Sequence, residues 1–195
     1  MQTTDASVAA AAVRDGELIA YPTETVYGLG ADALDPDAVA AVFDAKGRDR
    51  DDPISLAVPT VDAAAEYTDP TDRERAFMQE FLPGPVTVVL QRRSMVPDVL
   101  TAGRERVGVR VPDHDLALDL LAEVAPLTAT SANVSGQPSA RRVADIQGPL
   151  RDRLAVVLDG GRTPGGGSTV VDVERGEVHR RGHLADEVAD WLERH

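Results

Sequence analysis

Short runs of β-branched residues alternate along this chain with segments that have helical composition and capping residues. Residues 54–58, 86–90 and 107–111 are apolar and mostly rich in valine, which is typical of buried strands. Asp35-Pro36 combines a capping residue with proline at the first helical position, and predicts a helix to about residue 45. Because strands and helices are interspersed, we expect the fold class to be α/β.

A hairpin near the C-terminus indicates that the sheet is mixed. Residues 168–173 and 177–181 predict two antiparallel strands around Arg175-Gly176. Further helices are predicted at 5–14, 61–67, 72–82, 116–124, 142–146 and 184–194, further strands at 18–21, 127–130 and 154–158, and loops at 22–30 and 160–167. We therefore expect a sheet of at least seven strands. The 195 residues contain no repeat or linker, which predicts one domain over residues 1–195.

The chain is strongly acidic. It has 33 aspartate and glutamate residues against 20 lysine and arginine residues, a formal net charge of −13 at pH 7. Such a surface repels phosphate backbones, so direct nucleic-acid binding is not expected as the main activity. The composition resembles that of halophilic proteins. It predicts a high-salt habitat, where ions screen self-repulsion and the melting temperature rises with molar salt.

Several classes of protein and site are excluded by what the sequence lacks. Without cysteine there is no disulfide, thiolate metal site or cysteine nucleophile. No apolar run has the length of a membrane span and no secretory signal is recognisable, so we expect a cytoplasmic location and no membrane contact. A Walker P-loop, a dinucleotide fingerprint and a serine elbow are absent. The four histidines form no helical metal pair, so no protein metal site is expected.

Lys46 is the only lysine, and it stands two residues before Arg48 in Lys46-Gly47-Arg48. Lysine carries a compact ammonium on a flexible stem, whereas arginine carries a planar fork, so the two are not interchangeable. From its uniqueness alone, a functional role and a solvated surface charge are equally open.

Two other segments place small polar side chains two residues apart. In extended backbone, Thr23, Thr25 and Tyr27 would point to one side, and so would Ser131 and Asn133. Either segment could instead be a loop or turn that hydrogen-bonds to itself.

A fourth segment, Val107–Val111, has valines on one face of a predicted strand and Arg110 on the other. Gly108 beside Arg110 would leave room for a ligand. The alternative is an arginine that leaves the sheet and pairs with Asp113 or Asp115.

Taken together, these segments resemble the short, single-domain form of the YrdC-like family of threonylcarbamoyl-adenylate synthases. The matching pieces follow the family's order and cover most of the chain: PTETVYGLG (22–30), KGR (46–48), PIS (53–55), PGPVT (83–87), VGVRVP (107–112), TSANVSGQPS (130–139), STVVD (168–172) and RRG (180–182). The resemblance implies a twisted mixed sheet with flanking helices around a concave, locally positive cavity.

The resemblance also implies an activity. L-threonine, bicarbonate or carbon dioxide, and ATP would give threonylcarbamoyl-AMP and pyrophosphate, and a downstream threonylcarbamoyl transferase complex would modify tRNA. Mg²⁺ would come with ATP and be held mainly by its phosphates. The amino acid's carbamate would attack the α-phosphate, so positioning and charge neutralisation would suffice without a protein nucleophile.

Site residues follow from the same resemblance. Those implied for ATP are Lys46 and Arg48, which would also act in catalysis, with Ser131, Asn133, Ser168 or Thr169, and Arg181 in preference to Arg180. Those implied for threonine are Arg110, which would pair with the carboxylate, and Thr23, Thr25 and Tyr27.

One departure from the family pattern concerns Asp49, which follows Arg48 where many relatives have proline. A carboxylate there would repel phosphate unless it points away or meets Mg²⁺. Three alternatives remain: a module that binds double-stranded RNA, an enzyme that forms carbamoyl-adenylate as in hydrogenase maturation factors, and a structural protein with a degenerate site. The acidic charge, the lack of accompanying domains and the intact K-x-R and S-x-N elements argue against them in turn.

Overall fold

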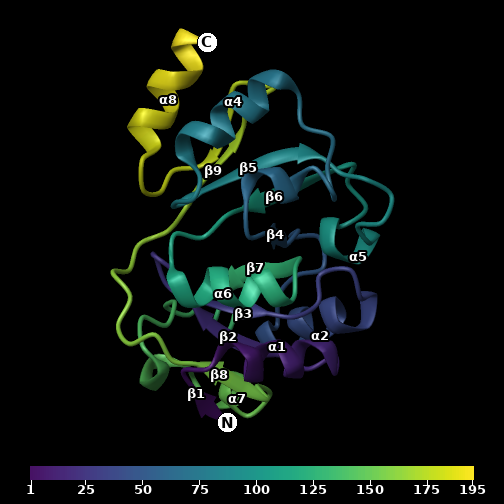
Figure 1. The fold of residues 1–195 in the computed structure, drawn as a ribbon, viewed down its shortest axis with the longest axis vertical. Coiled ribbons are helices and arrows are strands. Elements are labelled where there is room, and N and C mark those ends of the chain that lie inside the picture. The colour runs from purple at the N-terminus through teal and green to yellow at the C-terminus, as the bar shows by residue number, and fades with distance from the viewer.

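A computed structural model describes residues 1–195 and shows ten strands in one twisted mixed sheet (Figure 1). The strands are β1 (Gln2–Thr3), β2 (Ile19–Pro22), β3 (Tyr27–Gly30), β4 (Ser55–Ala57), β5 (Val86–Gln91), β6 (Arg106–Arg110), β7 (Leu127–Ser131), β8 (Val156–Leu158), β9 (Thr169–Asp172) and β10 (Glu177–Arg180). Their order is β1-β8-β2-β3-β7-β4-β6-β5-β9-β10. β4 runs parallel to β6 and β5 parallel to β9, whereas β5 and β6 are antiparallel. The predicted mixed α/β sheet is confirmed.

The helices are α1 (Ala6–Arg14), α2 (Pro36–Lys46), α3 (Val61–Ala64), α4 (Asp72–Phe81), α5 (Asp98–Thr101), α6 (Asp115–Glu123), α7 (Gly148–Arg151) and α8 (Ala185–Arg194), with a 3₁₀ turn at Val143–Asp145. The sequence predicts the start of α2 correctly. The Asp35 carboxylate accepts the Asp37 N–H at 2.9 Å, and Pro36 needs no hydrogen-bond partner there.

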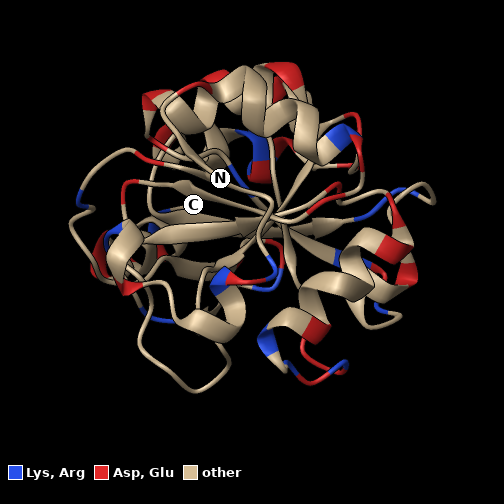
Figure 2. Cartoon of the chain, turned by 90° about the horizontal axis from the view of Figure 1, so that it is seen from below, with Lys and Arg blue, Asp and Glu red and all other residues tan.

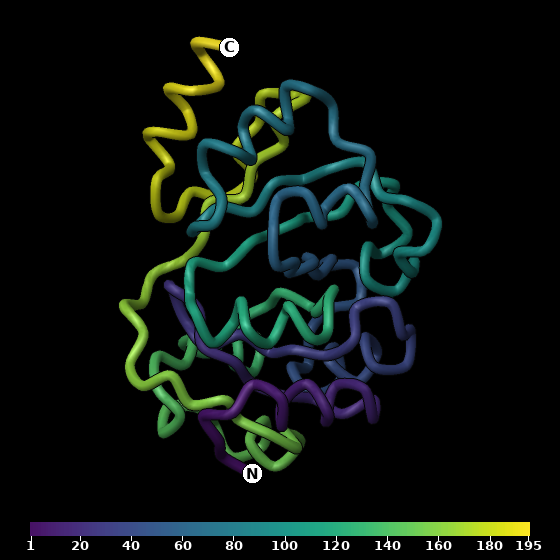
Figure 3. Tube along the Cα trace, viewed as in Figure 1, coloured from purple at the N-terminus to yellow at the C-terminus, as the bar shows by residue number.

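Helices cover the two faces of the sheet unequally. On one face, α1 and α6 pack against apolar residues of β2, β4, β7 and β8. On the other face, a larger apolar cluster includes residues of α2, α4, α5 and α7. The last helix, α8, joins this second layer, because the Trp191 ring meets the edge of Phe77 at 5.0 Å. The chain termini lie at opposite ends of the molecule (Figure 3). No helix is long and apolar enough to cross a membrane.

The α1/α6 face has a stretch of small side chains on neighbouring central strands. The register pairs Ser55 with Ala129, and the pairing of Leu56 with Val109 puts Ser55 beside Gly108. Because alternate residues of a strand share a face, all three point to the face that α1 and α6 cover only in part. This row of alanine, serine and glycine leaves a hollow over the middle of the sheet.

The segment predicted as a loop over residues 22–30 is partly a strand. Tyr27–Gly30 forms β3, antiparallel to β2. Glycines weaken a strand by propensity, but here the Tyr21 ring occupies the space above them. A Cβ at Gly28 would lie 2.9 Å from that ring. The short elements β1, α5 and α7 were also not predicted.

Candidate active site

A cavity of about 880 Å³ lies over the central strands, on the face that α1 and α6 leave open. Its walls come from the turn between β2 and β3, from β4, β5, β6, β7, β9 and β10, and from the chain after α2. Six arginines and three carboxylate residues line it. Acidic segments, by contrast, are spread over the outer helices and loops (Figure 2). Basic groups are therefore concentrated at this cavity in a chain whose overall charge is negative.

Arg110 reaches into the cavity from the end of β6. One terminal nitrogen donates to Ser168 Oγ, and the other donates to the Glu24 carboxylate and, at 3.0 Å, to Thr25 Oγ1. Neither nearby aspartate, Asp113 or Asp115, pairs with it. The structure thus brings Arg110, Thr25 and Ser168 together, although they are far apart in sequence.

The segment Thr23–Val26 is a turn and not extended backbone. The Thr23 and Thr25 hydroxyl oxygens lie 3.0 Å apart, and Thr23 Oγ1 donates to the Val26 carbonyl at 2.7 Å. Both threonines line the cavity. The alternative of a turn that hydrogen-bonds to itself therefore holds for Thr23. Thr23 and Thr25 nevertheless both remain part of the cavity wall.

Tyr27 points away from the cavity. Its side chain is fully buried, and its hydroxyl donates to Gly161 O at 2.8 Å and accepts the Gly160 N–H at 3.1 Å. Burial raises the pKa of this hydroxyl to about 12. The structure does not bring Tyr27 to the cavity wall with Thr23 and Thr25, because the turn interrupts the alternation that would put the three side chains on one side.

Lys46 ends α2, and Gly47 stops the helix with a left-handed conformation at φ 56°. The Lys46 ammonium donates to the carbonyls of Ser131 and, at 2.8 Å, Asn133. The Ser135 N–H donates to the Lys46 carbonyl at 2.8 Å. With 1% exposure, Lys46 does not line the cavity but fastens the loop after β7. Burial, and secondarily Arg48, lowers the pKa of Lys46 to about 8.

Arg48 does line the cavity. Its Nε donates to Asp52 O at 3.0 Å and its Nη2 to Pro53 O at 3.1 Å, so it has no carboxylate partner. Asp49 is exposed and lies outside the cavity wall, where its carboxylate accepts the Asp51 N–H at 3.0 Å. Asp49 therefore adds no carboxylate to the cavity wall.

Ser131 and Asn133 have different positions. Ser131 faces the cavity, and its hydroxyl donates to Asn133 Oδ1 at 2.5 Å. Asn133 is 8% exposed, and its amide donates to Val134 O at 2.8 Å and Gln137 O at 2.9 Å. In this structure Asn133 shapes the loop and Ser131 faces the ligand space.

Of the two consecutive arginines, it is Arg180 that lies in the cavity. Its Nε donates to Ser168 O at 3.0 Å, and its pKa is lowered by burial and then by Arg110 and Arg48. Arg181 is on the outside, paired with Asp186 at 2.5 Å, with 60% of its side chain exposed. The preference for Arg181 does not fit these positions. Arg180 is the last residue of β10, whereas Arg181 follows the strand, and the sequence did not show which of the two faces inward.

Ser168 and Thr169 are separated in the same way. Ser168 lines the cavity between Arg110 and Arg180. Thr169 faces the opposite side and its hydroxyl donates to His183 O at 2.7 Å. Of these two candidates, the geometry favours Ser168.

The far end of the cavity has an ion-pair cluster that sequence reasoning missed, in which one arginine meets three carboxylates. Arg106 Nη2 contacts Glu74 Oε1 at 3.0 Å and Asp172 Oδ1 at 3.1 Å, and Arg106 Nη1 pairs with Glu174. The signal was present, because Arg106 and Arg110 share one face of β6. Since Arg106 is neutralised while Arg48 and Arg180 are not, an anionic ligand is favoured at the latter end.

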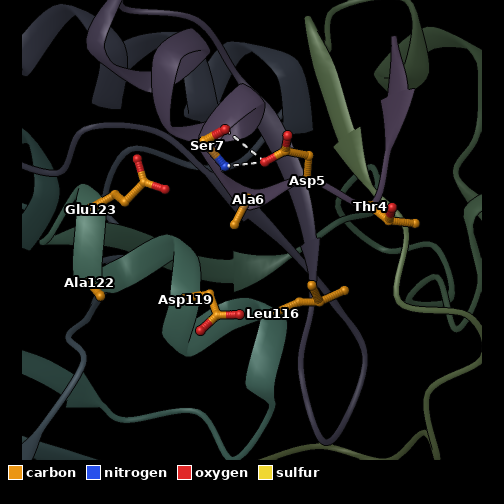
Figure 4. Close-up of a pocket in the computed structure, with 8 residues that line it drawn as sticks. All are labelled: Thr4, Asp5, Ala6, Ser7, Leu116, Asp119, Ala122 and Glu123. Carbon is orange, nitrogen blue, oxygen red and sulfur yellow. Dashed lines mark hydrogen bonds between the residues drawn. The ribbon is translucent and has the colours of Figure 1, made fainter.

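A second hollow, of about 610 Å³, lies between the start of α1 and helix α6 (Figure 4). Its acidic lining residues are Asp5, Asp119 and Glu123. Asp5 caps α1 by accepting the Ser7 N–H at 2.9 Å. None of the predicted site residues is here, and its carboxylates would repel an anion, so the central cavity is the candidate active site.

The family model Sua5/YciO/YrdC, described as telomere recombination, matches residues 11–182. The chain belongs to this family. Threonylcarbamoyl-AMP synthases from Pyrococcus abyssi and Bacillus subtilis are each 40% identical to it, over 169 and 171 residues. These matches cover 85% and 84% of this chain but 50% and 49% of the relatives. The chain therefore spans about half the length of these two relatives.

Solved structures agree with the family assignment. Pyrococcus abyssi Sua5 complexed with L-threonine is similar with a TM-score of 0.89 and 37% identity, covering 95% of this chain and 56% of that one. YciO from E. coli has a TM-score of 0.83 at 23% identity, with 94% of each chain covered, and supports the fold alone. The predicted family and fold are confirmed.

Proposed function

We propose that this chain is an L-threonylcarbamoyladenylate synthase, which makes threonylcarbamoyl-AMP and pyrophosphate from L-threonine, bicarbonate and ATP. The observation that supports it best is the position of Ser168 between two arginines. Arg110 donates to its hydroxyl and Arg180 to its carbonyl. Two cationic subsites thus adjoin in one cavity, as a reaction between a carboxylate-bearing amino acid and a triphosphate requires. The names of the relatives and the threonine complex of one of them support the same reading.

In this proposal Arg110 binds the threonine carboxylate. A guanidinium is a planar donor that suits a carboxylate, and Thr25 beside it adds a hydroxyl. Part of the Arg110 donor set is already engaged by Glu24, so the substrate uses the remaining N–H groups or shares the site with that carboxylate.

Arg48 and Arg180 hold the ATP phosphates, because both line the cavity without a carboxylate partner. Ser131 adds a neutral hydrogen bond. Lys46 acts mainly by fixing the loop that presents Ser131. Mg²⁺ enters with ATP, since this ion is held largely by phosphates and water with one or two carboxylates. Asp52 in the cavity wall fits the carboxylate role.

The chemistry needs no protein nucleophile. The threonine amine and bicarbonate give a carbamate and water as the N–C bond forms. A carbamate oxygen then attacks the α-phosphate, and pyrophosphate leaves with the electron pair of the broken P–O bond. The arginines contribute by positioning and charge stabilisation. A cytoplasmic transferase complex would then move the threonylcarbamoyl group to a tRNA adenosine.

Pyrophosphate release tests the proposal. With ATP, Mg²⁺, bicarbonate and L-threonine, in salt that keeps the fold intact, we expect release that stops when threonine is omitted. Arg110→Ala should abolish it at low threonine. Release that needs carbamoyl phosphate instead of threonine and bicarbonate would assign the enzyme to carbamoyl-adenylate formation, and no threonine-dependent release at all would reject the synthase.

A further inference from the structure

Two hydroxyl groups on the cavity floor have no hydrogen-bond partner in the protein. They belong to Ser55 of β4 and Thr87 of β5, which lie on either side of β6, and both residues line the cavity. Thr87 is only 4% exposed, but its hydroxyl is not fully buried. A nearly buried hydroxyl without a protein partner is costly unless a ligand or water supplies the hydrogen bond.

The sheet register fixes how these groups are arranged. Val109 of β6 pairs with Leu56 on one side and Val88 on the other. Ser55 therefore lies beside Gly108, and Thr87 lies beside Arg110. The patch extends about 7 Å along the strands, the length of two residues. Across the patch, neighbouring strands lie about 4.8 Å apart. The two hydroxyls therefore belong to a small polar surface next to the Arg110 guanidinium.

Gly108 keeps this floor open. A Cβ at this position would lie 2.9 Å from Thr87 Cγ2 and would overlap Ser55 Oγ. Glycine allows the two hydroxyl-bearing residues to approach β6 closely from both sides. A larger side chain would fill the space between them.

We propose that the patch formed by Ser55, Thr87 and Gly108 binds bicarbonate, an inference that rests on the proposed synthase function. Bicarbonate is a small oxyanion that accepts hydrogen bonds from several directions, and the patch offers two neutral hydroxyl donors beside the Arg110 guanidinium, whose charge Glu24 offsets in part. The triphosphate is larger and matches the unpaired Arg48 and Arg180. Bicarbonate on the patch lies beside a threonine held at Arg110, where its carbon can meet the amine.

Ser55→Ala and Thr87→Val test the assignment, because they remove a hydroxyl with little change in volume. Pyrophosphate release is measured against bicarbonate concentration in buffer freed of carbon dioxide. We expect the KM for bicarbonate to rise at least about fivefold in each variant, as for loss of a hydrogen bond to a charged group. The KM for ATP should stay within about twofold of wild type. So should the Kd for L-threonine, which is measured by calorimetry without bicarbonate.

Two further variants separate the role from general damage. Thr87→Ser restores the hydroxyl and should recover most of the bicarbonate affinity, even if Thr87→Val folds poorly. Ser139→Ala removes another cavity hydroxyl, one that has a protein partner in Asn133 Oδ1 at 3.5 Å, and should leave the KM for bicarbonate at the wild-type value.

An unchanged KM for bicarbonate in both Ser55→Ala and Thr87→Val, with an active wild-type enzyme, would overturn the bicarbonate site but not the proposed synthase function. A weakened Kd for L-threonine in place of a raised KM for bicarbonate would also overturn it, since the patch would then bind the amino acid. A wild-type protein with no threonine-dependent pyrophosphate release would reject the proposed function, and the bicarbonate site with it.

Discussion

Glu24 forms an ion pair with Arg110, and the same carboxylate accepts the Asp113 N–H at 3.2 Å. The side chains are only 15% and 12% exposed. The contact links the turn between β2 and β3 to the chain just after β6, two segments that are 86 residues apart. The proposed carboxylate-binding arginine is therefore held from a remote part of the chain.

Glu24→Gln should destabilise the protein, because it leaves a mostly buried guanidinium without its counter-charge. We expect the free energy of unfolding to fall by about 2–4 kcal/mol, measured by urea denaturation. Threonine affinity should also weaken, since Arg110 is less firmly oriented. Glu66→Gln, at an exposed position, is the control and should change stability by less than about 0.5 kcal/mol. A loss that small for Glu24→Gln would show that the ion pair contributes little.

Lys46→Arg should impair catalysis although it preserves charge. The wider guanidinium does not fit a site that is 1% exposed between two carbonyl oxygens. We expect the rate of pyrophosphate release to fall at least about tenfold, or about 1.4 kcal/mol of transition-state stabilisation. The reverse exchange Arg50→Lys, at an exposed position, should have little effect. Near-wild-type turnover in Lys46→Arg would mean that the lysine is not retained for its shape.

The lowered pKa of Lys46 predicts a dependence of ATP binding on pH. The folded protein loses the Lys46 proton near pH 8, whereas the unfolded chain keeps it to about 10.5. The cost of burying the charge is thus present below pH 8 and disappears as pH rises toward 10.5, so this residue's contribution to stability improves over that range. The folded protein loses the Lys46 charge around pH 8, so the loop that presents Ser131 to ATP is held less firmly above that pH.

The Kd for ATP, measured by calorimetry, should therefore rise between pH 7 and pH 9, by up to about tenfold, because the protonated fraction falls about that much across a pKa near 8. Lys46→Met has no such proton to lose and should lack the change. Equal pH dependence in the two proteins would rule out Lys46 as its source.

Arg180 and Arg181 form a matched pair for testing the phosphate subsite. Arg180→Ala should raise the KM for ATP at least about tenfold, because it removes a charge-assisted contact inside the cavity. Arg181→Ala removes an exposed charge paired with Asp186, and its kinetics should match wild type. The opposite result would place Arg181 at the phosphates, as its sequence context first indicated.

Tyr27→Phe should affect stability and not substrate binding. The Tyr27 hydroxyl holds the chain at residues 160–161, and its loss removes the hydrogen bonds to the Gly161 carbonyl and the Gly160 N–H, which are partly buried. We expect the free energy of unfolding to fall by about 1–3 kcal/mol with an unchanged Kd for threonine. Thr25→Val, at the cavity wall, should weaken threonine binding instead. Weaker threonine binding in Tyr27→Phe would return this residue to the amino-acid pocket.

Much of the fold was predictable because its signals are local. The Asp35-Pro36 start of α2 and the valine-rich strands β5 and β6 depend on capping and burial patterns within a few residues. The strand β3 was missed because its two glycines oppose strand formation. Only packing against Tyr21, on another strand, explains them.

The candidate site was predictable as a set of segments and less so residue by residue. Thr25, Arg48, Arg110, Ser131 and Ser168 all line one cavity. Tyr27 and Arg181 do not, because a turn precedes Tyr27 and strand β10 ends just before Arg181, and these features decide which side chain faces inward.

The sequence by itself determined the α/β class, the family and the residue types that line the candidate site, because these depend on local patterns and on motif identity. Only the tertiary structure decided that Lys46 fastens a loop, that Arg180 faces the cavity and that Glu24 holds Arg110. It also placed Ser55, Thr87 and Gly108 side by side. The physical reason is that contacts between strands depend on register and twist, which bring together residues that no local pattern relates.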